Sequence, residues 1–403
     1  MGLLFEDDLH DRLGTWPLAY IPYGGADFGE VLAAARAVGK GDDSAYFEAW
    51  NTAADRLMAE AQDALALGRR ASARDLLFRA SAFYATAYHP LYGAAVDRRL
   101  RAAHANQTRA FDQAMSLLEA QATPLSIPFE RWWLPGYFIP AATRPMSLRP
   151  LIIFINGYDG TMSDVYLASV VAASQRGYHC MIFDGPGQGA MLVQGSAKMR
   201  PDWESVIDAV LNVALTLPVV DAKRIAVSGW SLGGHLALRT AACDPRIAAC
   251  IADPGIWSMA GPLQDLGAQL GVEPHEMEDL SNVAPDVLEL LDSAIDFDRT
   301  LTWKIKRRGF WVHGVDTLAD YLNEISKFTL NGITHRITCP TLITQAENDP
   351  LAKSAEAVFE AVRGPKTLMP FEAADGAGDP CEMGNRSLLN RRVLDWVDEV
   401  FAY

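Results

Sequence analysis

The first part of the chain has a helical pattern of apolar and polar positions. Apolar side chains recur at intervals of three and four, and Gly68 follows the first such stretch as a helix stop signal. The pattern predicts helices over residues 45–67, 71–88 and about 92–118. These stretches share no fixed period, so helical repeats are not indicated. We interpret residues 1–122 as a helical N-terminal domain or cap that packs on the rest of the chain.

From about residue 123 the pattern is that of strands alternating with helices. The segment SIPFERWWLPGYFIP predicts a hairpin. Short apolar runs predict buried strands at 151–155, 179–184, 224–229, 248–253, 341–345 and 367–372. Helical patterns cover 163–176, 202–217, 233–242, 352–363 and 385–401. This alternation predicts an α/β fold over residues 123–403, with a mostly parallel central sheet that helices cover on both faces.

Residues 255–336 interrupt the alternation. They combine a loop, the acidic segment EPHEMEDL and helical stretches that carry tryptophans and histidines. An insertion of this size between two sheet strands is most simply a lid over the carboxyl edge of the sheet, where α/β folds bind their ligands.

Composition narrows the possible functions. The 403 residues are 50% hydrophobic and 21% charged, which suits two globular domains. A formal net charge of −15 argues against nucleic acid as a partner, because it would repel a phosphate backbone. Five scattered cysteines without C-x-x-C spacing argue against a disulfide framework and a zinc site, and we expect no metal and no cofactor.

The same residues bear on location. The N-terminus has no secretory pattern, and no apolar run approaches the roughly 20 residues of a membrane span. The expected setting is therefore a reducing cytoplasm, with a small-molecule substrate and no membrane partner.

The segment Gly229-Trp230-Ser231-Leu232-Gly233 has the G-x-S-x-G pattern of a nucleophile elbow. It follows the predicted strand RIAVS and precedes the helical HLALRTAA, which gives strand, sharp turn and helix. Such a turn holds the serine in a strained conformation at the N-terminus of a helix, close to backbone donors. The simpler interpretation is a glycine-rich turn with an incidental serine, and the order of elements favours the nucleophile.

An oxyanion that develops at this serine needs a second donor, which the loop after the first central strand normally supplies. That loop is NGYDGT, residues 156–161. The backbone N–H groups of Tyr158 or Asp159, with that of Leu232, are the candidate oxyanion hole. The carboxylate of Asp159 would repel an oxyanion unless protonated, so it is also a candidate acid or a partner for a substrate hydroxyl. A purely local role, bonding to loop backbone, is as plausible.

The acid of a serine–acid–histidine triad is expected after a later strand. The segment TLITQAENDP places Asp349 there, with Glu347 as a weaker rival in the same loop. The motif DGPGQG (184–189) follows another strand end, and we interpret it as a structural turn beside the cleft.

Taken together, these features resemble one branch of the α/β-hydrolase superfamily, which contains 2,6-dihydroxypseudooxynicotine hydrolase and the fungal polyketide-shortening (Ayg-type) hydrolases. The resemblance rests on the helical N-terminal region and on NGYDGT, FDGPGQG, GWSLGG, DPRIAACIADPG, WVHGVDTLADY and CPTLITQAENDP, from about residue 45 to the end. It implies cleavage of a carbon–carbon bond next to a ketone, or of an ester, without a cofactor and in a homodimer. It also implies that Ser231 is the nucleophile and Asp349 the triad acid, and that Asp159 lies near a functional glutamate of the nicotine enzyme.

The chain departs from this family at the base. Relatives carry a loop like G-(D/E)-H-C, whereas this chain has Gly378-Asp379-Pro380-Cys381, so Pro380 occupies the position expected for the histidine. Without a base, a serine hydroxyl is a poor nucleophile near neutral pH. Several interpretations remain open: another histidine acts as base, the pocket catalyses a non-hydrolytic cyclisation or elimination, the protein binds without turnover, or Pro380 is an engineered change.

Among the other histidines, His313 is the best candidate for a substitute base, because a lid residue can face the cleft. His335 lies in the same insertion, and for His235, four residues after the serine, packing in the elbow helix is the more plausible role. Aromatic residues would suit a flat aromatic or polyketide-like ligand, although aromatics at such spacings are more often core. The candidates for substrate contact are Trp230, Trp257 and Trp311.

Overall fold

The computed structural model describes residues 2–402, and within them one mixed sheet of eight strands forms the centre of the molecule. The strands are β1 (Thr123–Phe129), β2 (Trp132–Ile139), β3 (Arg149–Ile155), β4 (His179–Phe183), β5 (Val220–Trp230), β6 (Ala249–Asp253), β7 (Thr341–Ala346) and β8 (Lys366–Phe371). Their order in the sheet is β1-β2-β4-β3-β5-β6-β7-β8. The β1–β2 and β2–β4 pairs are antiparallel and all others are parallel. The predicted α/β-hydrolase fold is thus confirmed.

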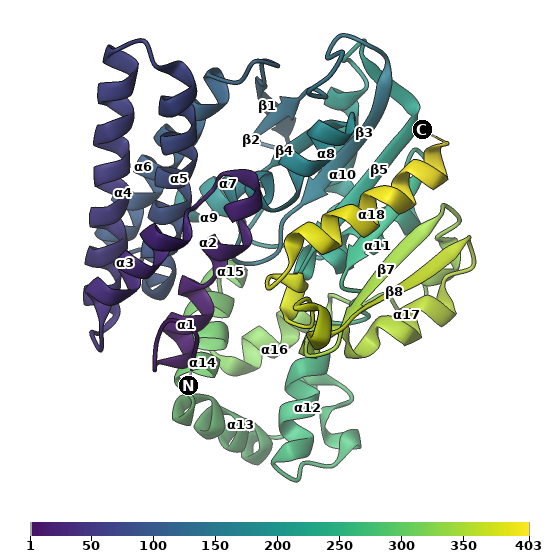
Figure 1. Ribbon diagram of the computed structural model, residues 1–403. Coiled ribbons are helices and arrows are strands. Elements are labelled where there is room, and N and C mark those ends of the chain that lie inside the picture. The colour runs from purple at the N-terminus through teal and green to yellow at the C-terminus, as the bar shows by residue number, and fades with distance from the viewer. Residues whose placement is uncertain (1, 403) are drawn as a thin grey trace.

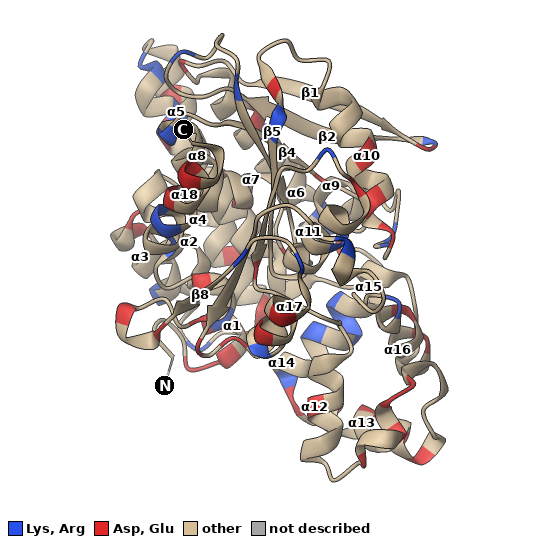
Figure 2. Cartoon of the chain, turned by 90° about the vertical axis from the view of Figure 1, so that its right-hand side faces the viewer, with Lys and Arg blue, Asp and Glu red and all other residues tan. Residues whose placement is uncertain are grey.

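Helices cover both faces of this sheet, which explains why its central strands are almost entirely apolar. Seen edge-on, α8 and α18 lie on one face and α10 and α11 on the other (Figure 2). The helices that follow or connect strands are α7 (Met162–Val165), α8 (Val171–Arg176), α9 (Gly189–Val193), α10 (Trp203–Ala214), α11 (Leu232–Cys243), α17 (Ala355–Ala361) and α18 (Arg386–Phe401). Parallel strands place their carboxyl ends at one edge, where the loops after β3, β5, β6 and β7 meet.

The N-terminal helices pack together, and the three longest of them lie beside the β1 side of the sheet (Figure 1). They are α1 (Asp8–Gly14), α2 (Trp16–Ala19), α3 (Phe28–Val38), α4 (Asp43–Ala66), α5 (Arg70–Tyr88) and α6 (Arg98–Ser116). A buried amide joins them to the sheet region, because Gln107 Nε2 donates to Thr161 Oγ1 at 2.7 Å and to Ser163 Oγ at 2.6 Å. Phe78 stacks on Tyr166 with ring centroids 4.9 Å apart, which continues the same contact.

The insertion between β6 and β7 is helical. It contains α12 (Gly261–Gln269), α13 (Pro285–Phe297), α14 (Arg299–Thr302), α15 (Phe310–His313) and α16 (Leu318–Ser326). A π-helical segment, Trp303–Gly309, joins α14 to α15. This insertion returns to the loop after β3, because Arg308 and His313 contact Asp159 and Tyr158 there.

Two predicted helices need correction, and one helical region was missed. The helix expected from residue 92 begins at Arg98, since His89–Leu91 form a short 3-10 turn around Pro90 and a loop follows. The helix expected over 163–176 is interrupted by a π-helical segment, Tyr166–Val170. Residues 8–38, for which no elements were predicted, form α1, α2 and α3. The first two helices have only 7 and 4 residues, which is too short for a helical repeat of apolar positions to be recognised.

Candidate active site

Ser231 stands at the turn between β5 and α11 in a conformation that few residues other than glycine adopt. Its φ is 54° and its ψ is −131°, and its own N–H donates to the carbonyl oxygen of Asp253 at 2.6 Å. A Cβ at Gly229 would lie only 1.8 Å from the carbonyl oxygen of Gly233, so this turn requires glycine. Strain of this kind costs about 1–3 kcal/mol and is retained mainly at functional sites. The nucleophile-elbow geometry predicted from G-x-S-x-G is therefore present.

The loop after β3 comes into direct contact with this serine. A Cβ at Gly157 would lie 3.1 Å from Ser231 Oγ, so only glycine lets the loop approach so closely. Within residues 2–402, the backbone N–H groups of Tyr158, Asp159 and Leu232 donate no hydrogen bond. Unpaired backbone donors are rare in a folded chain unless a ligand or solvent takes them. The structure thus brings together the three residues predicted as the oxyanion hole.

Asp349 follows β7 and is buried near the same edge. Its Oδ1 accepts from the N–H of Leu351 at 2.9 Å, whereas its Oδ2 is buried and has no partner within the described residues. Desolvation raises the pKa of Asp349, neighbouring Asp253 adds to the rise, and the backbone N–H groups of Leu351 and Cys381 oppose it. A half-satisfied carboxylate in this place has room for one more donor, which in a triad would be an imidazole N–H.

Pro380 begins a short 3-10 turn, Pro380–Glu382, in the loop before α18. This loop is held against the Asp349 loop, because the N–H of Asn348 donates to the carbonyl oxygen of Gly378 at 2.8 Å. Residue 380 therefore lies between two points, Gly378 and Cys381, that both face the Asp349 loop. Pro380, at the position where the sequence predicted a base, thus lies in a loop that adjoins the Asp349 loop.

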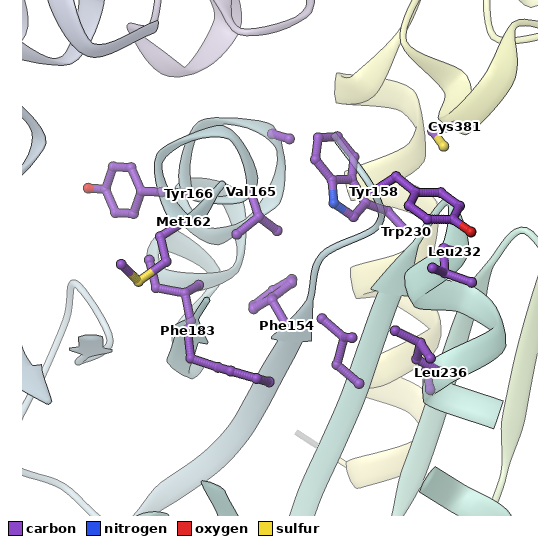
Figure 3. Packing of buried hydrophobic residues seen from close by; sticks show 14 of the residues in the cluster. Phe154, Tyr158, Met162, Val165, Tyr166, Phe183, Trp230, Leu232, Leu236 and Cys381 are labelled. Atoms are coloured by element: carbon purple, nitrogen blue, oxygen red, sulfur yellow. The ribbon is translucent and has the colours of Figure 1, made fainter. Parts of the chain in front are cut away.

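The turn after Pro380 is also strained and buried. Cys381 and Glu382 have φ values of 55° and 48°, in the left-handed region. Burial, and then the nearby Asp253 carboxylate, raise the pKa of Glu382 well above its ordinary value. Arg386 donates to Asp253 at 3.0 Å and to the carbonyl oxygen of Cys381 at 2.7 Å. Figure 3 shows Cys381 close to the elbow, beside Tyr158, Trp230 and Leu232.

Asp159 is fixed from three sides. Its Oδ2 accepts from Arg308 Nη1 at 2.6 Å, and both side chains are only 13% exposed. Its carbonyl oxygen accepts from His89 Nε2 at 3.1 Å and from the hydroxyl of Tyr92 at 3.2 Å. Arg308 also lies over the ring of Tyr158, 4.8 Å from the centroid. The carboxylate that sequence placed in the oxyanion loop is therefore neutralised by an arginine from the insertion, which no motif had indicated.

The two candidate histidines are held by other groups. His313 Nε2 and the Tyr158 hydroxyl are 2.6 Å apart, and burial followed by the charge of Arg308 lowers the pKa of His313 to about 3. His235 Nδ1 donates to the carbonyl oxygen of Ile256 at 3.1 Å, and burial lowers its pKa to about 4. Within residues 2–402, no histidine hydrogen-bonds to Ser231 or Asp349. His313 does reach the oxyanion loop, but through the tyrosine.

The predicted aromatic contacts differ in position. Trp230 is buried beside Ser231, with its Nε1 donating to Asn156 Oδ1 at 2.9 Å. Trp257 is half-buried and donates to Asn331 Oδ1 at 2.8 Å. Trp311 is buried and packs edge-on against Tyr92, with centroids 5.1 Å apart. Only Trp230 adjoins the elbow directly.

One side of the site comes from a segment that sequence reasoning passed over. Trp16 begins α2 and lies 6.2 Å from the ring of Trp230 and 5.2 Å from that of His89. Arg12, in α1, interacts electrostatically with Asp159, Cys381, Asp349 and Arg308. The N-terminal helices α1 and α2 thus border the site together with the insertion. A tryptophan and an arginine four positions apart are the only signal in the sequence, and it is too common to have been used.

Comparison with known proteins agrees with this geometry. Residues 152–382 match the family described as "Alpha/beta hydrolase family", and residues 42–259 match "Esterase FrsA-like". The chain belongs to the alpha/beta hydrolase family. It is 32% identical over 421 residues to the 20-hydroxy-prefusarin hydrolase of Gibberella moniliformis, with 100% of this chain and 99% of the relative covered. It is 29% identical over 409 residues to the hydrolase acrC of Aspergillus aculeatus, with 95% and 94% covered.

The fold has a solved counterpart. The crystal structure of 2,6-dihydroxy-pseudo-oxynicotine hydrolase superimposes with a TM-score of 0.74 at 23% identity, covering 95% of each chain. This hydrolase therefore shares its whole architecture with a solved structure and is related to fungal hydrolases. Among residues 2–402, no helix has the length and apolarity to cross a bilayer, and no three His, Cys, Asp or Glu side chains gather as metal ligands would.

Proposed function

We propose that this alpha/beta hydrolase acts through Ser231 on a carbon–carbon bond next to a ketone, or on an ester, of a small aromatic or polyketide-like substrate. The observation that carries the proposal is the contact between the strained Ser231 and the Gly157–Tyr158–Asp159 loop, with three unpaired N–H groups around it. Donors aimed at the place where an oxyanion develops typically contribute 10²–10³-fold each. The names of the fungal relatives support the substrate class, since one acts on a prefusarin.

In a hydrolytic reaction, the Ser231 oxygen attacks the substrate carbonyl and gives up its proton to solvent, and the oxyanion accepts from the N–H of Leu232 and from one or both loop N–H groups. The C–C or ester C–O bond then breaks and water protonates the leaving group. A second water hydrolyses the acyl-enzyme and returns the proton to Ser231. Asp349 is the acid of the site, with one free carboxylate oxygen. The base is the weak part, because Pro380 carries no proton acceptor. A positioned base typically contributes 10²–10⁴-fold, so acyl transfer in this chain is expected to be slow.

A second candidate is a non-hydrolytic reaction in the same pocket, such as cyclisation or elimination. It is favoured by the positions of His313 and His235, which bond to Tyr158 and to Ile256 rather than to Ser231. An oxyanion hole still stabilises an enolate when no acyl-enzyme forms. Activity that survives Ser231→Ala would support this candidate.

Reactive-serine labelling with a fluorophosphonate tests the proposal. We expect slow labelling of the native chain, none of Ser231→Ala, and fast labelling of Pro380→His. Fast labelling of the native chain would mean that a substitute base exists. If neither the native chain nor Pro380→His is labelled, the elbow does not present a nucleophile and the proposal is wrong. If the chain binds a ligand without turnover, and substitutions at positions 231 and 349 do not change that binding, it is a binding protein without catalytic activity.

A further inference from the structure

A group of cations surrounds the site of a strongly acidic protein. The chain has a net charge of −15, yet Arg12, Lys304 and Arg308 all lie around Asp159. Figure 2 shows the basic positions of the insertion gathered on the segment between α14 and α15. Asp159 and Asp349 are the carboxylates that interact with Arg12. The carboxylates that interact with Arg12 or Lys304 are thus Asp159, Asp349 and Asp298, and burial raises the pKa of Asp349.

Only one of these cations is used by the fold. Arg308 forms the ion pair with Asp159 at 2.6 Å. Arg12 and Lys304 make no ion pair and donate no side-chain hydrogen bond within residues 2–402. Other basic residues nearby are paired, since Arg299 bonds to Asp7 and Asp43, and Lys306 bonds to Asp292 and Asp296. Two cations near Asp159 that form no ion pair within the described residues contrast with these paired neighbours.

Both residues belong to segments that contact the site, through Trp16 and through Arg308. Arg12 lies four positions before Trp16, which contacts Trp230 and His89, so the α1–α2 segment presents this side to the elbow. Arg12 is an exposed residue overall, and its charge interacts with Asp159 and Asp349. Lys304 lies four positions before Arg308 on the π-helical segment, and Arg308 Nε donates to the carbonyl oxygen of Lys304 at 3.3 Å.

An arrangement of free cations next to unpaired backbone donors recognises a negatively charged oxygen. We propose that Arg12 and Lys304 bind an acidic group of the substrate, a carboxylate or the enolate of a β-dicarbonyl, and so hold its neutral carbonyl at Ser231. This inference deepens the proposed function and rests on it. The planar guanidinium of Arg12 suits two oxygens at once, and Lys304 adds a second charge at a single point.

The electrostatic environment agrees with an anion-binding site. Burial, then the charges of Arg12 and Arg308, lower the pKa of Lys304 to about 8, although Asp159 and Asp298 oppose the change. Desolvation by burial, followed by the charge of Arg308, lowers the pKa of Arg12. Asp298 is exposed and caps α14 by accepting from the N–H of Leu301 at 2.9 Å. A bound anion would relieve the repulsion among the cations, and its binding should weaken as pH rises through about 8 and Lys304 loses its proton.

The experiment is isothermal titration of the full chain with 2-naphthoate and with its neutral isostere 2-naphthamide at pH 7. We expect naphthoate to bind more tightly than naphthamide. Arg12→Gln and Lys304→Gln should each weaken naphthoate about 10-fold or more, the usual loss for a charged hydrogen bond, and leave naphthamide unchanged. Lys306→Gln is the matched control from the same segment and should change neither ligand. Equal binding of the two ligands, or an equal loss in Lys306→Gln, overturns the proposal.

Two further arms sharpen the result. 2-Acetyl-1,3-indandione, an acidic β-dicarbonyl, is titrated beside naphthoate, and the tighter ligand identifies the source of the oxyanion. The naphthoate affinity of the native chain should fall between pH 7 and 9, whereas Lys304→Arg should hold it constant, and a loss of the same size in Lys304→Arg would contradict the role of Lys304. All titrations are repeated in Ser231→Ala. Binding that persists there with no labelling of Ser231 in any variant would refute the proposed reaction and leave the anion site intact.

Discussion

Replacing Pro380 by histidine would supply the base that the proposed site of Ser231 and Asp349 lacks. Residue 380 lies between Gly378 and Cys381, whose backbones face the Asp349 loop, and Asp349 Oδ2 is buried without a partner within the described residues. An imidazole there would donate to this oxygen and present its other nitrogen to Ser231. The free energy available is that of a positioned general base, about 10²–10⁴-fold or roughly 2.7–5.4 kcal/mol in the labelling barrier.

The assay is the second-order rate of fluorophosphonate labelling, followed over pH 5–9. We expect Pro380→His to raise this rate by at least about 100-fold, with a rise through pH 6–7 as the imidazole becomes neutral. Pro380→Gln is the control for shape without a base, and it should label as slowly as the native chain. Loss of proline should cost only about 0.4–1 kcal/mol of stability through the unfolded chain.

Three results would refute this reasoning. If Pro380→His and Pro380→Gln are labelled at the same rate, the loop does not aim residue 380 at the serine. If Asp349→Ala leaves the gain in Pro380→His unchanged, Asp349 is not the acid that orients the base. Labelling that persists in Ser231→Ala, Pro380→His would show that the reactive group is another residue.

Individual contacts give three further predictions. Asp159→Ala should cost about 3 kcal/mol in chemical denaturation, because it leaves Arg308 buried without its partner, and adding Arg308→Met should recover part of the loss; a double variant as unstable as the sum of the single ones would contradict the pairing. His313→Phe should lower the free energy of unfolding by about 1–3 kcal/mol, because it leaves the Tyr158 hydroxyl unpaired. Added to Pro380→His, it should change the labelling rate by no more than a few-fold. A loss of most of that labelling rate would instead show that His313 acts as a base. Burial raises the pKa of Asp184 from 3.8 to about 6, so the folded state holds this proton more tightly than the unfolded chain. Its contribution to stability, on the order of 3 kcal/mol, is then complete below about pH 4 and is lost as pH rises through about 6. In a denaturation series at pH 4–7, the free energy of unfolding should therefore change less with pH in Asp184→Asn than in the native chain.

Local sequence patterns predicted most of the strands and helices of this protein. The alternation of apolar runs and helical stretches predicted the parallel sheet, because a strand buried on both faces must be apolar throughout. The G-x-S-x-G turn predicted Ser231 at the end of β5, and the segment TLITQAENDP predicted Asp349 after β7. Each of these signals depends on residues adjacent in sequence, and each element lies within a few residues of its expected range.

Tertiary structure decided what surrounds those residues. The ion pair of Asp159 joins residues 149 positions apart, and the His313–Tyr158 contact joins residues 155 positions apart. Neither has a sequence signal, since any arginine or histidine of the insertion was an equal candidate. The same holds for Arg12, on a short helix with too few apolar positions to be predicted at all. The sequence alone determined the fold and the sharp turn at Ser231, because these follow from backbone periodicity and turn chemistry, whereas the roles of Ser231 and of position 380 stay predictions. Which charges meet around the serine was decided by the packing of α1 and of the insertion onto the carboxyl edge of the sheet.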